Sequence, residues 1–189
     1  MSDTSWSVNK FGGGSLAGAA EFRAVARILM ETGGGARAAV VSASAGITDR
    51  LMALVDDPAE ESAAPGMAGI RDHHLALAEA LLPQPAVGDY VSKLDKDLET
   101  VAAIVGAVRL LGRSAPEARS LVSGFGEVWS ARLLSAHLSS LGVSSEWLHA
   151  GDVLTIRDSE LGPIVMWEES RRRLESRMPA DPSCILVIT

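Results

Sequence analysis

Residues 6–16 read WSVNKFGGGSL, and this stretch decides the fold. Its first part, residues 6–11, has the aromatic and β-branched content of a short strand. The strand runs directly into three glycines and Ser15. Residues 17–31 then place apolar side chains at helical spacing. A strand, a glycine loop and a helix in this order predict the first unit of an α/β domain.

The same order of elements returns immediately downstream. Residues 38–42 are a short apolar, β-branched run, which predicts a buried strand. A loop of small residues follows over 44–48, and we expect a helix over 49–55. Alternating strands and helices favour parallel strands with helices on the faces of the sheet. The fold class is therefore predicted to be α/β, a three-layer sandwich with a mainly parallel sheet between helices.

Longer helices dominate the rest of the chain, and 87–111 has the clearest signal because its apolar residues recur every three or four positions. The last strand is strongly apolar with nothing after it, so we expect the domain to be cut short on its C-terminal side. The further expectations are a loop over 56–67, helices over 70–82 and 87–111, a third strand-to-helix junction at 119–127, a helix over 129–141, a strand over 143–148, irregular chain over 151–162, an extended piece at 164–165, a charged helix over 167–176 and a strand over 184–189.

Composition narrows the possible classes of function. The chain has 189 residues, 47% hydrophobic and 22% charged, which suits one folded domain. A net charge of -7 argues against a nucleic-acid binder, which needs a basic surface. The single cysteine, Cys184, makes no internal disulfide and no cysteine metal site. Without a visible signal peptide or a run of about 18 apolar residues, we expect a cytoplasmic protein that does not span a membrane.

The glycine loop after the first strand is the strongest chemical signal. Glycines let backbone N–H groups approach an anion closely, and the following helix N-terminus adds a favourable dipole. Lys10 could reach the phosphates of a nucleotide and offset charge that develops during phosphoryl transfer. The spacing matches neither a P-loop nor G-x-G-x-x-G. On these residues alone, a plain glycine-rich turn with an exposed lysine explains the pattern equally well.

Two further small-residue segments repeat the design. Over 42–48, serine and threonine hydroxyls could bind a phosphate or carboxylate, although on these residues alone capping of the next helix by Ser44 or Thr48 is somewhat favoured. Over 123–127, Glu127 could hold an ammonium group, although a first-turn glutamate is also favoured by the helix dipole. Three such strand-to-helix junctions would meet at one edge of the sheet, as a nucleotide and a small substrate require.

Other polar residues give weaker signals. His73 and His74 are adjacent on a helix and point about 100° apart, so they do not form a metal pair and are interpreted as surface or groove histidines. The basic run 171–173 shares its helix with glutamates, which favours a solvated face. The four tryptophans are too scattered for a stacking platform and are interpreted as packing residues.

Three segments resemble the sequence signatures of aspartate kinases (aspartokinases) in the amino-acid kinase family. Residues 8–15 (VNKFGGGS) resemble V-x-K-F-G-G-T-S, residues 41–51 (VSASAGITDRL) resemble V-S-A-x-x-G-x-T-x-x-L, and residues 123–130 (SGFGEVWS) resemble S-x-G-E-x-x-S. The signatures occur in family order over essentially the whole chain. The stretch 160–168 is also similar to fusions of aspartate kinase with diaminopimelate decarboxylase.

This resemblance implies the amino-acid kinase fold, with an eight-stranded, mainly parallel sheet. It implies transfer of the ATP γ-phosphoryl group to the β-carboxylate of L-aspartate, with Mg²⁺, as the first step of lysine, threonine and methionine synthesis. The partner is then L-aspartate as substrate, with no nucleic acid and no membrane. The full-length form is expected to be a homo-oligomer.

The family roles carry over onto matching positions. Lys10 is the implied catalytic residue and contacts the transferring phosphates. Thr48 and Glu127 are the implied aspartate-binding residues, with Glu127 on the amino group. No residue is assigned to a metal ion. The implied ATP phosphate-binding set is Lys10, Gly12, Gly13 and Ser42.

The sequence departs from the family pattern at three places. Gly14 replaces a usual threonine, and residues 149–151 (HAG) stand where Asp-Ala-Arg is frequent. The later family segment T-T-L-G-R-G-G-S-D-x-T and the regulatory ACT domains are absent from these residues. We therefore interpret residues 1–189 as the N-terminal portion of a catalytic domain that is inactive by itself. Two alternatives stay open: another amino-acid kinase, acting on glutamate, acetylglutamate or a nucleoside monophosphate, or a non-catalytic remnant that binds a partner or a small ligand.

Overall fold

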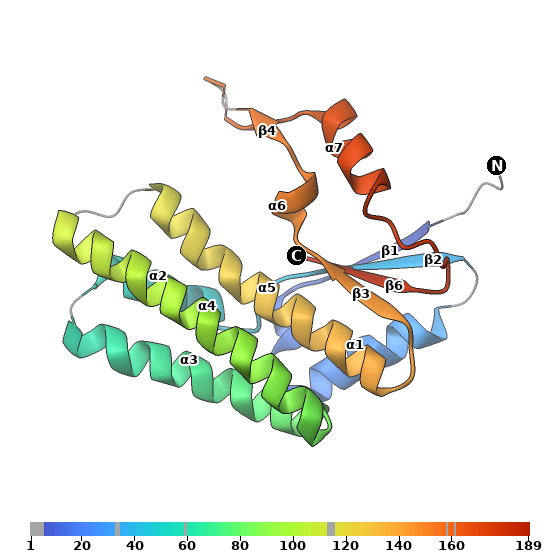
Figure 1. The fold of residues 1–189 in the computed structure, drawn as a ribbon, viewed down its shortest axis with the longest axis horizontal. Helices are drawn as coiled ribbons and strands as arrows, with labels where there is room; N and C mark the ends of the chain where they lie inside the picture. Colours follow the sequence, from blue (N-terminus) through green and yellow to red (C-terminus); the bar gives the residue numbers. More distant parts are fainter. Residues whose placement is uncertain (1–5, 33–34, 59, 113–115, 158, 161) are drawn as a thin grey trace.

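The computed structural model describes residues 6–32, 35–58, 60–112, 116–157, 159–160 and 162–189 (Figure 1). Along the chain the elements are β1 (Trp6–Phe11), the 3-10 helix η1 (Gly13–Leu16), α1 (Ala19–Glu31), β2 (Ala36–Val41), α2 (Ile47–Asp56), α3 (Glu60–Leu81), α4 (Gln84–Leu111), α5 (Pro116–Ser140), β3 (Ser145–Leu148), α6 (Ala150–Val153), β4 (Ile156–Arg157), β5 (Ile164–Val165), α7 (Trp167–Glu175) and β6 (Ile185–Ile188).

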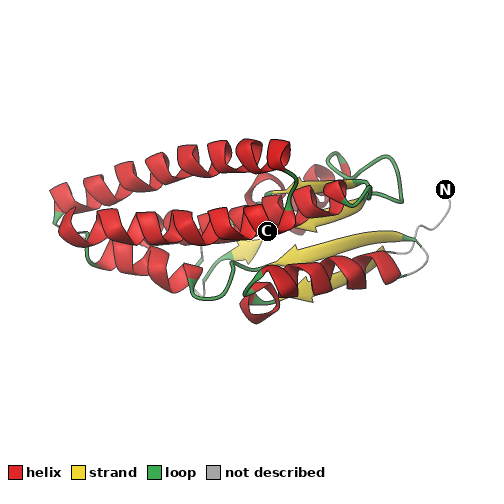
Figure 2. Ribbon diagram, turned by 90° about the horizontal axis from the view of Figure 1, so that it is seen from below, coloured by secondary structure: helices red, strands yellow, loops and turns green. Residues whose placement is uncertain are grey.

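The main sheet of the described residues has four strands, in the order β1-β2-β6-β3. All neighbouring strands in it are parallel, and β6 enters between β2 and β3. The carboxyl ends of the four strands therefore lie together at what we call the carboxyl edge. Helices α2 to α5 extend past this edge (Figures 1 and 2). The short strands β4 and β5 pair separately and antiparallel.

Alternation along the strands builds two cores, one on each face of the sheet. Val41 and Val187 join the larger core, which includes residues of α1 to α5. Ala38 and Leu186 face the other way and pack with Val153 of α6. The resulting layers are helices, sheet and the smaller α6–α7 layer (Figure 1). The predicted three-layer α/β sandwich is confirmed.

The loop predicted over 56–67 is wrong, because α3 already begins at Glu60. Pro65 lies inside this helix, where a proline removes one backbone hydrogen bond. Packing explains why the helix persists. A Cβ built on Gly66 would come within 2.7 Å of Leu54 Cδ2, so α3 lies directly against α2 at this point.

The third strand-to-helix junction, predicted at 119–127, is also wrong. This stretch lies inside the continuous helix α5, and the described residues between α4 and α5 contain no strand. The glycines have a different cause here, since a Cβ on Gly126 would come within 2.8 Å of Ala43 Cβ and 3.1 Å of Ile47 Cγ2. Gly126 is thus a close-packing position, where the α5 backbone approaches the segment between β2 and α2. Local sequence cannot distinguish such a glycine from one in a turn.

We predict opposite effects for two substitutions on α5. Gly126→Ala should lower the free energy of unfolding by about 1–3 kcal/mol, because Ala43 is too short to move aside. Gly124→Ala, the matched control, meets nothing within 4 Å and should stabilise the helix by about 0.5–1 kcal/mol. Urea unfolding of both variants measures the difference. Equal effects would contradict the packing role of Gly126.

Candidate active site at the carboxyl edge

Two segments that follow adjacent strands form the centre of the carboxyl edge. The first, residues 12–16, follows β1 and contains η1, and the second, residues 42–46, follows β2; we call them the first and second loops. The Ser42 N–H donates to the Phe11 carbonyl at 3.1 Å, which joins the two where they leave the sheet. Ligands of open parallel sheets bind outside such strand ends.

The first loop forms a tight turn and packs against the second loop. The Ser15 N–H donates to the Gly12 carbonyl at 2.9 Å. A Cβ on Gly13 would sit 3.0 Å from the Ala43 carbonyl oxygen, so glycine allows this approach. Gly14 is different, because a Cβ there would meet nothing within 4 Å. Local packing therefore favours glycine at position 13 and not at position 14.

Lys10 is exposed near the end of β1 and forms no hydrogen bond or ion pair with the described residues. Side chains at alternate positions of a strand share one face. Lys10 therefore leaves the sheet on the side of Trp6, which packs against the smaller core, while Phe11 enters the larger one. An unpaired ammonium group next to a glycine loop is chemically suited to bind a phosphate.

The second loop engages its two serines differently. Ser44 is buried, and its hydroxyl donates to the Leu16 carbonyl at 2.7 Å. Ser42 is half-buried, and the described residues offer its hydroxyl no hydrogen bond. Helix α2 follows Gly46, whose φ of 76° is left-handed, and no side chain caps it. The suggested capping by Ser44 or Thr48 is thus not observed, and Thr48 is exposed in the first turn.

Glu127 reaches this region from α5. It is exposed and adjacent in sequence to Gly126, which contacts the second loop at Ala43 and the start of α2 at Ile47. The structure therefore brings the segments that carry Lys10, Thr48 and Glu127 to one end of the sheet. Glu127 comes from mid-helix, and not from a strand end as the sequence predicted.

The family model of the amino acid kinase family matches residues 5–180. The chain belongs to the amino acid kinase family. Its curated relatives include bifunctional aspartokinase/homoserine dehydrogenase 1, chloroplastic, of Arabidopsis thaliana, 27% identical over 98% of this chain. Bifunctional aspartokinase/homoserine dehydrogenase 2 of Escherichia coli K12 is 34% identical over 78% of this chain. The alignments cover 21% and 18% of these relatives, so the chain spans about a fifth of their length.

Solved structures support the same fold. Escherichia coli aspartokinase III, in complex with aspartate and ADP, superposes with a TM-score of 0.82 at 23% identity, over 96% of this chain and 40% of that one. Clostridium acetobutylicum aspartate kinase gives a TM-score of 0.68 at 17% identity, over 95% of this chain and 38% of that one. These likenesses establish an amino acid kinase fold for the described residues.

In this family member, residue 149 caps a helix. His149 Nδ1 accepts a hydrogen bond from the Gly151 N–H at 2.8 Å, at the start of α6. The ring lies so close that a Cβ on Gly151 would come within 2.7 Å of it. The Ala150 N–H donates to Thr189 Oγ1 at 2.9 Å, which ties the end of β3 to the end of β6. Residues 149–151 thus help to build the edge through hydrogen bonds.

The sequence analysis missed the role of two histidines. His73 is half-buried, and its Nε2 lies 3.0 Å from the Ser44 hydroxyl. His74 is fully buried, so its interpretation as a surface or groove residue is wrong. Its Nδ1 lies 2.9 Å from the Tyr90 hydroxyl, and its ring packs edge-on against Trp129 at 5.2 Å. Helical spacing carried the signal, because residue 74 continues the apolar positions 70, 77, 78 and 81.

Burial also shifts the acid–base behaviour of both rings. Burial and, to a smaller extent, the neighbouring His73 lower the pKa of His74 to about 3. Burial and the charge of Arg50 lower the pKa of His73. Both imidazoles are therefore neutral at neutral pH.

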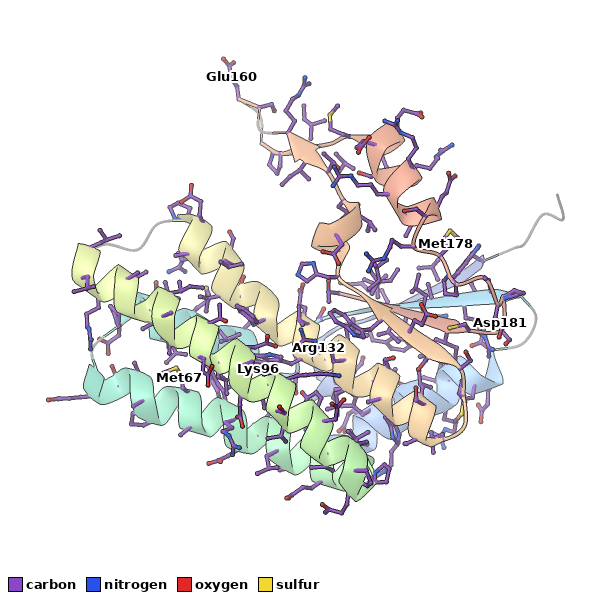
Figure 3. All side chains as sticks on the ribbon, viewed as in Figure 1. Met67, Lys96, Arg132, Glu160, Met178 and Asp181 are labelled. Atoms are coloured by element: carbon purple, nitrogen blue, oxygen red, sulfur yellow. The ribbon has the colours of Figure 1, made fainter. Side chains whose placement is uncertain are left out.

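A cluster of charged and aromatic side chains holds α5 against α4 and β3. Asp97 Oδ2 of α4 accepts hydrogen bonds from Trp129 Nε1 at 3.0 Å and from Arg132 at 2.5 Å. Arg132 is labelled on α5 in Figure 3. Its guanidinium also lies 4.9 Å from the ring centre of Trp147 on β3. These contacts join α4, α5 and β3, and so help to hold the helix that carries Glu127.

Within the described part of the chain, no group of three or more His, Cys, Asp or Glu side chains could hold a metal ion. Among the same residues, no helix is long and apolar enough to cross a membrane.

We predict that His74 makes the folded protein sensitive to acid. Its pKa is lower in the folded protein than in the unfolded chain, so the unfolded chain takes up the proton first as pH falls. The free energy of unfolding therefore decreases as the pH falls from about 6.5 to 3. At pH 5 the decrease due to His74 is about 2 kcal/mol. His74→Gln should remove that part of the pH dependence. The measurement is urea unfolding at pH 7 and pH 5. The assignment would be contradicted if the free energy of unfolding of His74→Gln fell between these pH values by as much as that of the wild type.

Proposed function

We propose that this chain is the N-terminal portion of an aspartate kinase catalytic domain. The observation that carries the proposal is the meeting of three segments at Ala43: the first loop through Gly13, the second loop itself and α5 through Gly126. Names of relatives support the substrate, since aspartokinase III was solved with aspartate and ADP. The proposed reaction is transfer of the γ-phosphoryl group of ATP to the β-carboxylate of L-aspartate.

In the proposed reaction, a β-carboxylate oxygen attacks the γ-phosphorus, and the bond from that phosphorus to the β,γ-bridging oxygen breaks. The products are aspartyl phosphate and ADP. Lys10 offsets charge on the transferring group, and the N–H groups of the first loop, with Gly12 and Gly13, approach the phosphates. Ser42 lines the phosphate region. Thr48 and Glu127 bind aspartate, and Glu127 takes its amino group.

Mg²⁺ belongs to the proposal as the ion that accompanies ATP. The described residues offer no cluster of three metal-binding side chains. In phosphoryl-transfer sites Mg²⁺ is commonly held by substrate phosphates and only one or two carboxylates. No catalytic step is therefore assigned to a metal site of this chain.

An uncovered apolar surface supports the proposed domain organisation. Val8 of β1 is 64% exposed, although it belongs to the main sheet. It lines an apolar pocket of about 340 Å³ on the α7 side, together with Trp6, Ala38, Leu174, Met178, Leu186 and Ile188. We propose that other parts of a longer protein cover this face and complete the nucleotide site, so that residues 1–189 alone are inactive. We further propose a cytoplasmic homo-oligomer for the full-length form.

Calorimetric titration of the 189-residue chain with Mg-ATP, L-aspartate and L-glutamate tests the substrate assignment. We expect L-aspartate to bind and L-glutamate to bind at least tenfold more weakly. Preference for L-glutamate would replace the assignment with another amino-acid kinase. Aspartate binding without phosphoryl transfer in the longest form of the protein would instead favour a non-catalytic remnant, an alternative that also agrees with Gly14 in place of the family's threonine.

We predict that Lys10→Ala abolishes most of the activity in the longest form of the protein that contains this segment. Loss of a charge that stabilises the transition state should lower kcat about a hundredfold or more. Lys93→Ala is the matched control, because Lys93 lies on α4 and pairs with exposed Asp89 at 2.8 Å. Trapping aspartyl phosphate with hydroxylamine measures the rate. A Lys10→Ala enzyme with wild-type kcat would overturn the role of Lys10.

We predict a different kinetic effect for Glu127→Gln. The carboxylate is assigned to the amino group of bound aspartate, so its loss should raise the KM for aspartate about tenfold or more and leave the KM for ATP nearly unchanged. Exposed Glu117 in the first turn of the same helix offers the control Glu117→Gln. An equal rise in both KM values would show that the substitution disturbs the whole site and would remove Glu127 from aspartate recognition.

A further inference from the structure

One buried hydroxyl connects both loops of the carboxyl edge to α3. Ser44 of the second loop is 1% exposed. Its Oγ lies 2.7 Å from the Leu16 carbonyl oxygen, at the end of η1, and 3.0 Å from His73 Nε2 on α3. Three elements that are distant in sequence therefore meet at one oxygen atom.

Proton counting fixes the direction of both hydrogen bonds. A serine hydroxyl has one proton to donate and two lone pairs that accept. A backbone carbonyl can only accept, so the Ser44 proton points to Leu16. The contact with His73 must then be donated by the ring, which requires a proton on Nε2. Neutral His73 therefore carries its proton on Nε2 and leaves Nδ1 unprotonated.

We propose that His73 is a positioning residue of this site, which holds the second loop against the first through Ser44. Its hydrogen bond uses one lone pair of Ser44 and orients the hydroxyl toward Leu16. Leu16 is the last residue of η1, so anchoring its carbonyl fixes the turn formed by residues 13–15. The catalytic consequence rests on the proposed function, whereas the hydrogen-bond arrangement does not.

The surroundings of His73 favour this role over simple packing. The ring is half-buried, and packing alone could be satisfied by a nonpolar side chain. What histidine adds at this position is a hydrogen-bond donor to Ser44. A ring edge contacts His74 at 5.4 Å between centroids, which limits rotation. Burial and, to a smaller extent, the charge of Arg50 disfavour a second proton on the ring. The single proton of the Ser44 hydroxyl is then engaged by Leu16, which leaves Ser42 as the second-loop serine whose hydroxyl proton can turn to a ligand.

The tautomer can be measured directly. Nitrogen-15 NMR of the His73 ring in the 189-residue chain, at neutral pH, should show Nε2 protonated and Nδ1 unprotonated. Ser44→Ala should shift the Nε2–H resonance. A protonated Nδ1 in the wild-type chain would overturn the proposal, whether or not the protein transfers phosphate.

A pair of substitutions separates the donor from the shape of the ring. The side-chain nitrogen of glutamine can occupy the place of histidine Nε2, whereas asparagine is too short. We expect His73→Asn to shift the amide resonances of residues 13–16 and to weaken Mg-ATP binding about tenfold, the value of one hydrogen bond to a buried group. His73→Gln should restore both. Equal behaviour of the two variants would overturn the positioning role.

The control and the readouts keep this test distinct from that of the proposed function. Asp72→Asn changes the exposed neighbour on α3 and should leave the loop amides at their wild-type positions. If the wild-type chain binds no Mg-ATP, nucleotide binding requires the further parts of a longer protein that are proposed to complete the site, and the tautomer and the amide shifts still decide the role of His73. Wild-type amide shifts in His73→Asn would overturn it.

Discussion

The site depends on the close approach of two backbones to Ala43. Gly13 brings the first loop within contact of the Ala43 carbonyl, and Gly126 brings α5 against its methyl group. A side chain at either glycine would have to displace backbone or a methyl group that has no freedom to move. Ala43 itself is buried, so the contact belongs to the larger core and is not a surface feature. The packing of the core and the shape of the candidate site are thus set by the same three residues.

Local sequence predicted the elements whose pattern is local. The strands at 6–11, 38–42 and 184–189 correspond to β1, β2 and β6, and the long helix over 87–111 corresponds to α4. Their signals are runs of apolar residues or apolar residues at helical spacing, which depend on near neighbours alone. The alternation of strands and helices also predicted parallel strands. In parallel strands the carboxyl ends meet at one edge, which is where the first and second loops lie in the structure.

The irregular chain predicted over 151–162 is wrong in part, because it contains β4 and most of α6. The wrong predictions over 56–67 and 119–127 share one physical cause. Residues 56–67 and 119–127 contain proline or glycine, which local rules read as breaks. In the structure, Gly66 and Gly126 mark places where a helix packs directly on α2 or on the segment before it. The benefit of that contact lies in residues 12 or more positions away, so no local pattern could reveal it. The candidate site was predictable only in part for the same reason. Lys10 and Gly13 belong to one short motif that local sequence reveals, whereas the hydrogen bond between Ser44 and His73 spans 29 positions.

Two kinds of glycine occur at this edge: those at close-packed positions, which the fold explains, and Gly14, which it does not. At position 126 neighbouring atoms occupy the space of a Cβ, and at position 13 the Ala43 carbonyl leaves only a tight space for one. Position 14 has open space and no positive φ, so neither packing nor backbone geometry explains its glycine. The resemblance to aspartate kinases would place a threonine hydroxyl there. A threonine would fit without disturbing the contacts at Ala43. The departure at Gly14 therefore concerns what the loop offers to a ligand and leaves the fold that supports the loop unchanged.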